Sequence, residues 1–305
     1  MARISLDGDV RDAEATPELC LGLETGDIVF FPETPFPLAS EDRAFLLQQK
    51  QAGASFHKNI SYRPTADRLK GADQKDPAAL NRMHEIMRRF SQRAIQFVAS
   101  FLPSYAEDWK IDFASFRPNE EQGRKIAHRS RNDLIHVDSF PSRPSHGDRL
   151  LRIFTNIHPD RSRVWVTSEH FETLAENYAR QAGLNSFRPG PLSDLRGQTL
   201  RLLSNVGLPV VDRPAYDRFM LQFHHFLKQD TTFQQGCRKD LWLFPPGSSW
   251  MVFTDASSHS CVSGQYALEQ TFIVRRSSLA YPEKAPLAIL ERLSGFPMIP
   301  RAKSA

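Results

Sequence analysis

The most regular pattern of apolar and polar positions in the chain lies between residues 77 and 103. Apolar side chains recur there at spacings of three and four residues, the period of one buried helix face. Asp76 precedes the segment as an N-cap, Pro77 occupies its first turn, and Pro103 ends it. The pattern predicts an amphipathic helix over 77–101. Its apolar positions are Leu80, Met83, Met87, Phe90, Ala94, Phe97 and Phe101.

Short runs of β-branched and aromatic residues, separated by turn-forming residues, follow from about residue 105 and are typical of strands. Helical patterns interrupt them over 170–181 and 214–227, and another lies over 41–51. The predicted strands cover 26–32, 111–117, 133–137, 150–157, 163–167, 241–244, 250–254 and 266–274. Strict alternation of strand and helix is missing, which argues against a doubly wound parallel sheet. The pattern favours a mainly β fold, an antiparallel barrel or sandwich with a helical layer against it.

Length and composition are those of an ordinary globular protein, with 305 residues, 40% of them hydrophobic and 24% charged. We expect a single domain, with an N-terminal extension of buttressing helices over about 1–104 and a β core over about 105–280. The helices over 170–181 and 214–227 could close over a site as a lid, but packing against the core is the simpler expectation.

Charge and apolar runs exclude several classes of protein. The net charge is only +4 and basic pairs are scattered, so nucleic acid is not an expected partner. No apolar run reaches the roughly 18 residues of a membrane span, and the first 15 residues contain no signal-like stretch. Three distant cysteines, Cys20, Cys237 and Cys261, indicate reduced thiols rather than a disulfide framework or a zinc site. We expect a soluble, cytoplasmic protein.

Histidine followed two positions later by an acidic residue is the strongest chemical signal. Glycine-rich phosphate loops, the G-x-S-x-G elbow and the EF-hand loop are absent from the sequence. The arrangement H-x-[DE] occurs four times, whereas ten histidines and 35 acidic residues in 305 predict about one occurrence by chance. Histidine and carboxylate chemistry is therefore the first candidate.

Local context separates the four pairs. His136 and Asp138 lie in a predicted strand, where residues two apart project from the same face. Such a pair supplies two corners of a facial metal triad. The pairs at 146–148 and 158–160 contain Gly or Pro and indicate turns. The pair at 170–172 begins a helix, where side chains two residues apart point in different directions. Only His136 and Asp138 have usable geometry.

A facial triad needs a second imidazole, which in a barrel would come from a strand facing the first. His259 follows the predicted strand 250–254 and is the candidate. A lone histidine is otherwise commonly a satisfied or surface residue. The remaining candidates, in polar stretches or on the amphipathic helix, carry less information: His57, His128, His224 and His225.

Three stretches resemble a known enzyme family. HVDSFPSRPSHGDRLLRIFTNIHPD at 136–160 and SSWMVFTDASSHSCVSGQYALEQTF at 248–272 are similar to iron(II)/2-oxoglutarate-dependent oxygenases, and more closely to the Kdo hydroxylases. FHKNISYRP at 56–64 resembles the same family, so the similarity runs from about 50 to 275. The resemblance implies that the core at about 105–280 is a double-stranded β-helix, the jelly-roll or cupin-like fold.

The resemblance also implies the chemistry. Kdo hydroxylases use iron(II), 2-oxoglutarate and O2 to hydroxylate C3 of 3-deoxy-D-manno-oct-2-ulosonic acid (Kdo) in Kdo-lipid A, which gives the sugar Ko. In this chain, His136, Asp138 and His259 are expected to hold the iron and to leave three positions for 2-oxoglutarate and O2. The implied partner is a lipopolysaccharide precursor, met by peripheral contact at the inner face of the inner membrane.

The resemblance is less direct for the residues that bind the cosubstrate and the substrate. Many relatives place an Arg about eleven positions after the distal His, where this chain has Gln270. A second arrangement takes the cation from the strand after H-x-D, which favours Arg152 as the partner of the 2-oxoglutarate carboxylate, with Gln270 as a neutral contact. Three cations that flank the family-like segments are candidates for Kdo or lipid A phosphates: Lys58, Arg129 and Arg143.

Three alternatives stay open at this point. The same chemistry could act on another small molecule or on a protein side chain. A barrel could bind a metal or a sugar without turnover, since barrel folds often host binding alone. A zinc hydrolase could use the same three ligands, and would then depend on zinc and not on O2.

Overall fold

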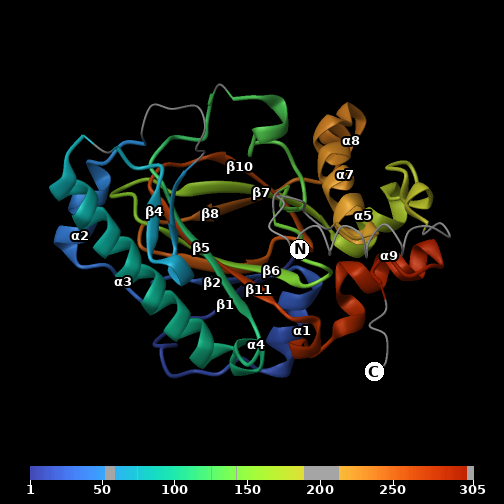
Figure 1. Ribbon diagram of the computed structural model, residues 1–305, viewed down its shortest axis with the longest axis horizontal. Helices are drawn as coiled ribbons and strands as arrows, with labels where there is room; N and C mark the ends of the chain where they lie inside the picture. The colour runs from blue at the N-terminus through green and yellow to red at the C-terminus, as the bar shows by residue number, and fades with distance from the viewer. Residues whose placement is uncertain (52–58, 74, 125, 142, 189–212, 301–305) are drawn as a thin grey trace, which may run out of the picture.

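The computed structural model describes residues 1–51, 59–73, 75–124, 126–141, 143–188 and 213–300 (Figure 1). In this part of the chain, an eight-stranded sheet has the order β1-β2-β9-β6-β11-β5-β3-β4, and a three-stranded sheet has the order β10-β7-β8. The strands are β1 (Arg3–Ser5), β2 (Ile28–Phe31), β3 (Ile60–Arg63), β4 (Arg68–Lys70), β5 (Lys110–Arg117), β6 (Arg149–Asn156), β7 (Arg163–His170), β8 (Asp240–Phe244), β9 (Ser249–Phe253), β10 (Ser257–Ser263) and β11 (Ala267–Val274).

The centre of the fold is a jelly roll. Strands β9, β6, β11 and β5 are neighbours in the larger sheet, and each adjacent pair is antiparallel. From β6 onward the chain passes between the larger and the smaller sheet, as in a double-stranded β-helix. An aromatic cluster fills part of the space between the sheets: Phe154, Trp165, Trp242, Phe244 and Trp250. The predicted fold class is confirmed.

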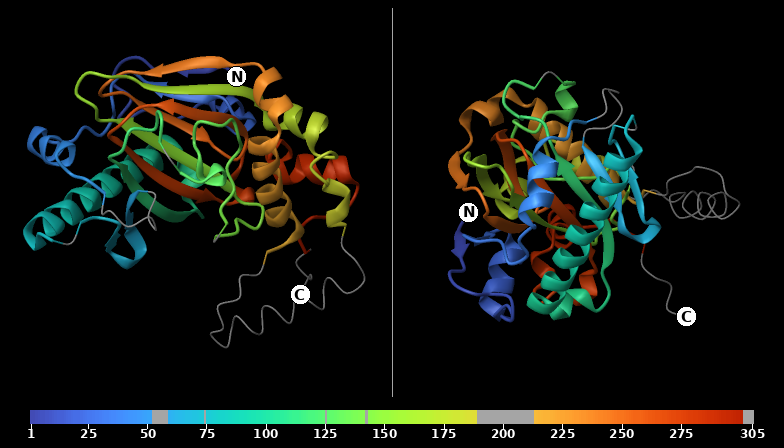
Figure 2. Two further views of the ribbon diagram at one scale, coloured as in Figure 1. Left: turned by 90° about the horizontal axis from the view of Figure 1, so that it is seen from above. Right: turned by 90° about the vertical axis from the view of Figure 1, so that its left-hand side faces the viewer.

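Helix α3 (Pro77–Phe101) lies across the outer face of the larger sheet (Figure 2). The Asp76 carboxylate accepts backbone N–H groups of its first turn, as expected of an N-cap. On its buried face, the rings of Phe97 and Phe101 pack edge-on against Phe31 of β2, with centroids 5.5 and 5.7 Å away. The predicted helix over 77–101 is confirmed at both ends.

Helices α5, α7, α8 and α9 gather at one end of the two sheets (Figures 1 and 2). Helix α7 lies in the long connection between β7 and β8, and its buried face includes Phe219 and Phe223. The Gln234 amide of α8 bonds both backbone groups of Ile135, at 3.1 and 2.8 Å. The helices are α1 (Pro17–Thr25), α2 (Ser40–Leu47), α4 (Pro103–Ala106), α5 (Phe171–Tyr178), α7 (Ala215–Gln229), α8 (Thr231–Gly236) and α9 (Pro286–Ser294), with short 3-10 turns at Pro64–Ala66, His128–Ser130, Leu184–Phe187, Arg276–Ser278 and Pro282–Lys284.

The structure differs from the prediction at two points near the site. The expected strand 133–137 is reduced to one isolated bridge at His136, since Ile135 bonds to helix α8 and Val137 to helix α7 instead of to a strand. His259 follows β9 as predicted, but it lies within a further strand that was not predicted, β10, whose residues are SSHSCVS. Serine-rich runs have low strand propensity, so this strand depends on pairing with β7 and carries no local signal.

The turn between β9 and β10 is held tightly against helix α1. This helix ends at Gly26 with φ of 108°, and a Cβ there would lie 2.7 Å from the carbonyl oxygen of Ala256. The buried Arg149 guanidinium bonds Asp255 at 2.9 Å and the carbonyl oxygen of Glu24 at 3.2 Å. Because this turn leads directly into β10, these contacts help to fix the position of His259.

Candidate metal centre

Backbone pairing brings His136 and Asp138 together with His259, although more than 100 residues separate His259 from the other two along the chain. The N–H group of each of His136 and His259 donates to the carbonyl oxygen of the other, at 3.0 and 2.9 Å. The N–H of Asp138 donates to the carbonyl oxygen of Thr254 at 2.8 Å. The segment 136–138 thus runs beside β10 and the end of β9.

The three side chains converge from this backbone. His136 Nε2 lies 3.5 Å from Asp138 Oδ1, and His259 Nε2 lies 4.0 Å from Asp138 Oδ2. The centroids of the two imidazoles are 4.9 Å apart. Donor atoms that share one metal ion through bonds of about 2.1 Å are themselves about 3 to 4 Å apart. The distances from Asp138 to the two imidazole nitrogens therefore suit a single ion.

Both imidazoles are oriented by backbone carbonyls. His136 Nδ1 lies 2.6 Å from the carbonyl oxygen of Leu134, and His259 Nδ1 lies 2.9 Å from that of Ser257. A carbonyl oxygen only accepts, so each Nδ1 carries the hydrogen and each Nε2 keeps its lone pair. Burial lowers the pKa of His136 to about 3 and also lowers the pKa of His259. Both rings are neutral, as metal binding requires.

Asp138 supplies a largely buried anion. Burial works to raise its pKa, yet the Arg152 guanidinium and the neighbouring imidazoles hold that pKa well below its usual range. Its Oδ2 lies 3.0 Å from Arg152 Nη1, but the two groups are not aligned for hydrogen bonding, so Oδ2 receives no donor. A buried carboxylate oxygen of this kind, beside two imidazole lone pairs, fits a divalent cation.

Arg152 faces the interior between the sheets. Besides its contact with Asp138, its Nε lies 3.4 Å from Glu269 Oε1. Glu269 also accepts a hydrogen bond of 3.0 Å from Arg117 Nε, and although burial works to raise its pKa, Arg117 and Arg152 lower it to about 2. Sequence patterns did not indicate Arg117, because strand alternation alone does not show which face lies inside. The structure thus places the largely buried Arg152 guanidinium beside Asp138, with Glu269 and Arg117 behind it.

Gln270 points the other way. It alternates with Glu269 along β11, and its side chain is fully buried under α3. Its Oε1 accepts from the Ser91 hydroxyl at 2.7 Å, and its Nε2 donates to the carbonyl oxygens of Asp112 and Thr271 at 3.1 and 2.9 Å. Because this face is separated from the triad by the sheet itself, we do not retain the prediction that Gln270 contacts the cosubstrate.

The predicted substrate cations differ in position. Arg143 forms an ion pair with Asp112, its guanidinium stacks 4.3 Å from the Phe140 ring, and its side chain is about one-third exposed. Arg129 is exposed on a 3-10 turn, where its carbonyl oxygen accepts a 3.2 Å hydrogen bond from Lys228. Lys58 lies outside the described residues.

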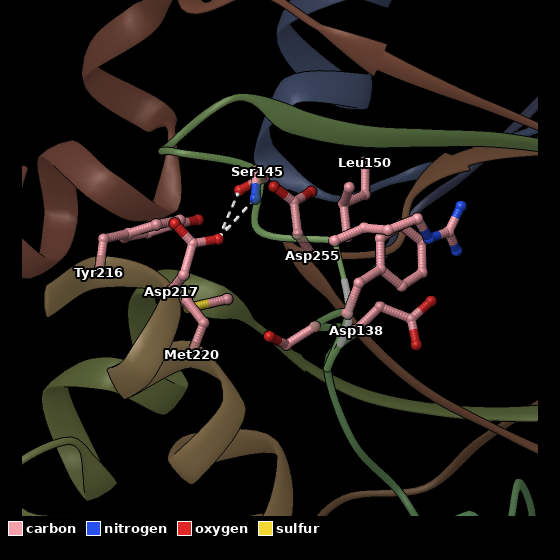
Figure 3. A pocket seen from close by; sticks show the side chains of 10 residues that line it. Asp138, Ser145, Leu150, Tyr216, Asp217, Met220 and Asp255 are labelled. Carbon is pink, nitrogen blue, oxygen red and sulfur yellow. Dashed lines mark hydrogen bonds between the residues drawn. The ribbon is translucent and has the colours of Figure 1, made fainter. Parts of the chain in front are cut away.

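A small recess next to Asp138 is lined by Arg143 and by residues of α7 (Figure 3). Asp217 of α7 accepts from the backbone N–H groups of Ser145 and His146, at 2.6 and 3.0 Å. Figure 3 shows Asp217 and Asp138 on different sides of the recess. Helix α7 therefore anchors the loop that follows Asp138 as well as packing against the core.

Helix α7 also brings His224, which carried little information in the sequence, and Lys228, which no sequence pattern indicated. His224 and Lys228 are buried one turn apart, and the His224 ring lies 4.8 Å from the His136 ring. Burial lowers the pKa of Lys228 to about 8. The available signal was two polar residues at i and i+4 beside the apolar stripe of an otherwise amphipathic helix, which is unusual for a purely packing face.

The chain matches a known protein family over nearly its whole length. A family model described as 3-deoxy-D-manno-oct-2-ulosonic acid (Kdo) hydroxylase matches residues 7–297. The chain belongs to the Kdo hydroxylase family. This confirms the expected class, iron(II)- and 2-oxoglutarate-dependent hydroxylases. No curated protein sequence matches the chain.

Solved structures agree with the membership in the Kdo hydroxylase family. The Kdo hydroxylase KdoO, a non-heme Fe(II) alpha-ketoglutarate-dependent dioxygenase solved with cobalt(II), is 34% identical over 99% of both chains, with a TM-score of 0.84. KdoO solved with alpha-ketoglutarate and Fe(III) is 33% identical over 100% of both chains, with a TM-score of 0.83. None of the helices in the described part of this Kdo hydroxylase has the length and apolar character of a membrane span.

Proposed function

We propose that His136, Asp138 and His259 hold iron(II) in this Kdo hydroxylase. The observation that carries the proposal is the convergence of two oriented, neutral imidazoles on a buried carboxylate that lacks a hydrogen-bond donor at Oδ2. When bound, iron(II) supplies the activation of O2 that is coupled to oxidation of 2-oxoglutarate (alpha-ketoglutarate) and to hydroxylation of the sugar. The residues of the chain bind the ion, orient the reactants and shield the site from water.

Arg152 is proposed to bind the far carboxylate of 2-oxoglutarate. It lies beside the triad, and its planar guanidinium matches a carboxylate in two-point hydrogen bonding. A metal ion at Asp138 would take over the charge that Arg152 now balances, which would leave the guanidinium available to the cosubstrate. Glu269 and Arg117 fix its position from the opposite side.

Aromatic side chains exclude water behind the triad. The Trp165 ring stacks on His259 with centroids 4.9 Å apart and an interplanar angle of 19°. Trp242 Nε1 donates to the Thr167 hydroxyl at 2.6 Å, so its polar atom is satisfied within this wall. A dry wall limits unproductive reactions of the activated metal site with water.

The substrate is proposed to be Kdo in Kdo-lipid A, hydroxylated at C3 to give Ko. Kdo carries a carboxylate and lipid A carries phosphates, and Arg143 offers a partly exposed guanidinium at the recess beside Asp138. Arg129 is a second candidate, on the turn whose carbonyl oxygen Lys228 binds. Lys58 stays a prediction from the sequence.

Contact with the inner face of the inner membrane is proposed to involve strand β8. Among the described large apolar side chains, Leu241 and Leu243 are the most exposed, at 67% and 49%. They project from an edge strand, and the exposed Arg238 and Lys239 directly precede that strand. Exposed apolar side chains beside cations suit an anionic lipid surface.

The double variant Leu241→Ser with Leu243→Ser tests this contact. It should co-sediment less with phosphatidylglycerol vesicles than wild type and should turn over detergent-dispersed substrate as wild type does. Unchanged co-sedimentation would contradict the contact.

The test of the reaction is a mass and product balance. The protein is incubated with Fe(II), 2-oxoglutarate, O2 and Kdo-lipid A, with free Kdo as the comparison. We expect one succinate formed for each acceptor that gains the mass of one oxygen atom, and no turnover by His136→Ala. An equal rate of succinate formation with and without Kdo-lipid A, or an acceptor of unchanged mass, would contradict the proposed substrate.

A further inference from the structure

A third imidazole faces the carboxylate of the proposed triad. Donor atoms of His136, Asp138 and His224 all lie within 4.8 Å of one another. The rings of His136 and His224 meet edge-on, with an interplanar angle of 80°. His224 comes from α7, and so from neither of the two backbone segments that carry the triad.

His224 is oriented in the same way as the other two imidazoles. Its Nδ1 lies 2.7 Å from the carbonyl oxygen of Val137, so Nδ1 carries the hydrogen and Nε2 is the nitrogen left for an ion. Metal-binding histidines commonly donate their second nitrogen to a carbonyl in this manner. The anchoring carbonyl belongs to the residue between His136 and Asp138, which ties α7 directly to the site.

We propose that His224 is a fourth protein donor for the metal, bound while 2-oxoglutarate is absent and released when 2-oxoglutarate binds. The inference rests on the proposed function of the triad. Three protein donors leave three positions on a six-coordinate ion, and the cosubstrate and O2 together need all of them. A fourth protein donor is therefore compatible with the free enzyme and incompatible with the complete reaction complex.

Competition between His224 and the cosubstrate has a thermodynamic consequence. Removing His224 should weaken metal binding when 2-oxoglutarate is absent and leave it unchanged when 2-oxoglutarate is saturating. By reciprocity, the metal-loaded variant should bind 2-oxoglutarate more tightly than wild type, by the same factor. We expect a factor of about 10 or more, the range found when a residue that supports a metal site is lost.

The experiment is a titration of the full chain with Co(II), without and with saturating 2-oxoglutarate, followed by the visible absorption of the ion. Wild type is compared with His224→Ala, and His225→Ala is the matched control. His225 is the neighbouring imidazole on the same helix, but it lines an open groove with Gln222 and Phe226. We expect the spectra of wild type and His224→Ala to differ before 2-oxoglutarate is added and to converge afterwards.

The possible results separate the inference about His224 from the proposed metal centre. Equal Co(II) affinity of wild type and His224→Ala without 2-oxoglutarate overturns the inference alone. An equal loss in both conditions also overturns it, because His224 would then not be displaced. Wild type that binds no Co(II) overturns the proposed metal centre itself. If His224→Ala does not fold, His224→Gln keeps a donor for Val137 while removing the imidazole, and the same criteria apply.

Discussion

Replacement of Arg152 by Met tests the proposed cosubstrate anchor. The Arg152 side chain is 12% exposed, and its nitrogens lie 3.0 Å from Asp138 Oδ2 and 3.4 Å from Glu269 Oε1. A hydrogen bond to a charged group contributes about 1.5 to 3 kcal/mol. Since about 1.4 kcal/mol is a tenfold change in affinity, Arg152→Met should raise the KM for 2-oxoglutarate about 10- to 100-fold. Methionine replaces the apolar stem of the side chain without its charged group, so the loss reports the guanidinium.

Initial rates of succinate formation at varied 2-oxoglutarate concentration measure this effect. Arg152→Lys keeps the charge without the planar fork and should fall between wild type and Met. Arg89→Met is the control, because Arg89 pairs with Asp42 on the outer side of the larger sheet. An unchanged KM in Arg152→Met would refute the anchor and would transfer the role to Arg117, the other largely buried guanidinium that pairs with Glu269.

Three further predictions concern the supporting residues. Gln270→Leu leaves the buried Ser91 hydroxyl without its acceptor and should lower the free energy of unfolding, measured in urea, by about 1–3 kcal/mol. The KM for 2-oxoglutarate should not change, and a raised KM would restore a cosubstrate role for Gln270. Arg149→Met leaves the Asp255 carboxylate buried and unpaired and should cost about 3–5 kcal/mol by the same assay, whereas a loss below 1 kcal/mol would refute this pairing. Burial lowers the pKa of Lys228 from 10.5 to about 8, so its stabilising contribution is complete above pH 10.5 and is lost as pH falls through 8. In chelator-treated protein, the stability of wild type relative to Lys228→Met should therefore rise by about 3 kcal/mol between these pH values, and a flat difference would contradict the burial of the ammonium.

The parts of the fold that the sequence predicts well are those with a strong local period. Helix α3 has a capping residue, a proline at its first turn and a continuous apolar stripe, so local forces and tertiary packing agree on its ends. Strand β10 is different, because its serines have little preference for a strand and its position comes from pairing with β7. The position of His259 on a strand therefore depends on contacts that no local pattern encodes.

The candidate site also combines residues that a local sequence pattern indicates with residues whose position depends on tertiary packing. His136 and Asp138 could be chosen from their spacing within a predicted strand and His259 from its place after another, and the family resemblance pointed to Arg152. The inward direction of Arg152, the outward direction of Gln270 and the position of His224 follow from how the sheets and α7 pack together. Period-two alternation assigns neighbours to opposite faces but does not say which face is inside.

Anaerobic titration of the protein with Fe(II) and 2-oxoglutarate tests the central claim most directly. The weak visible charge-transfer band of the iron and 2-oxoglutarate complex is followed in wild type, His136→Ala, His259→Ala and the control His225→Ala. We expect the band to form in wild type and in His225→Ala and to be lost in the two triad variants. A band of full intensity in His136→Ala or His259→Ala, or no band in iron-loaded wild type, would contradict the proposed metal centre.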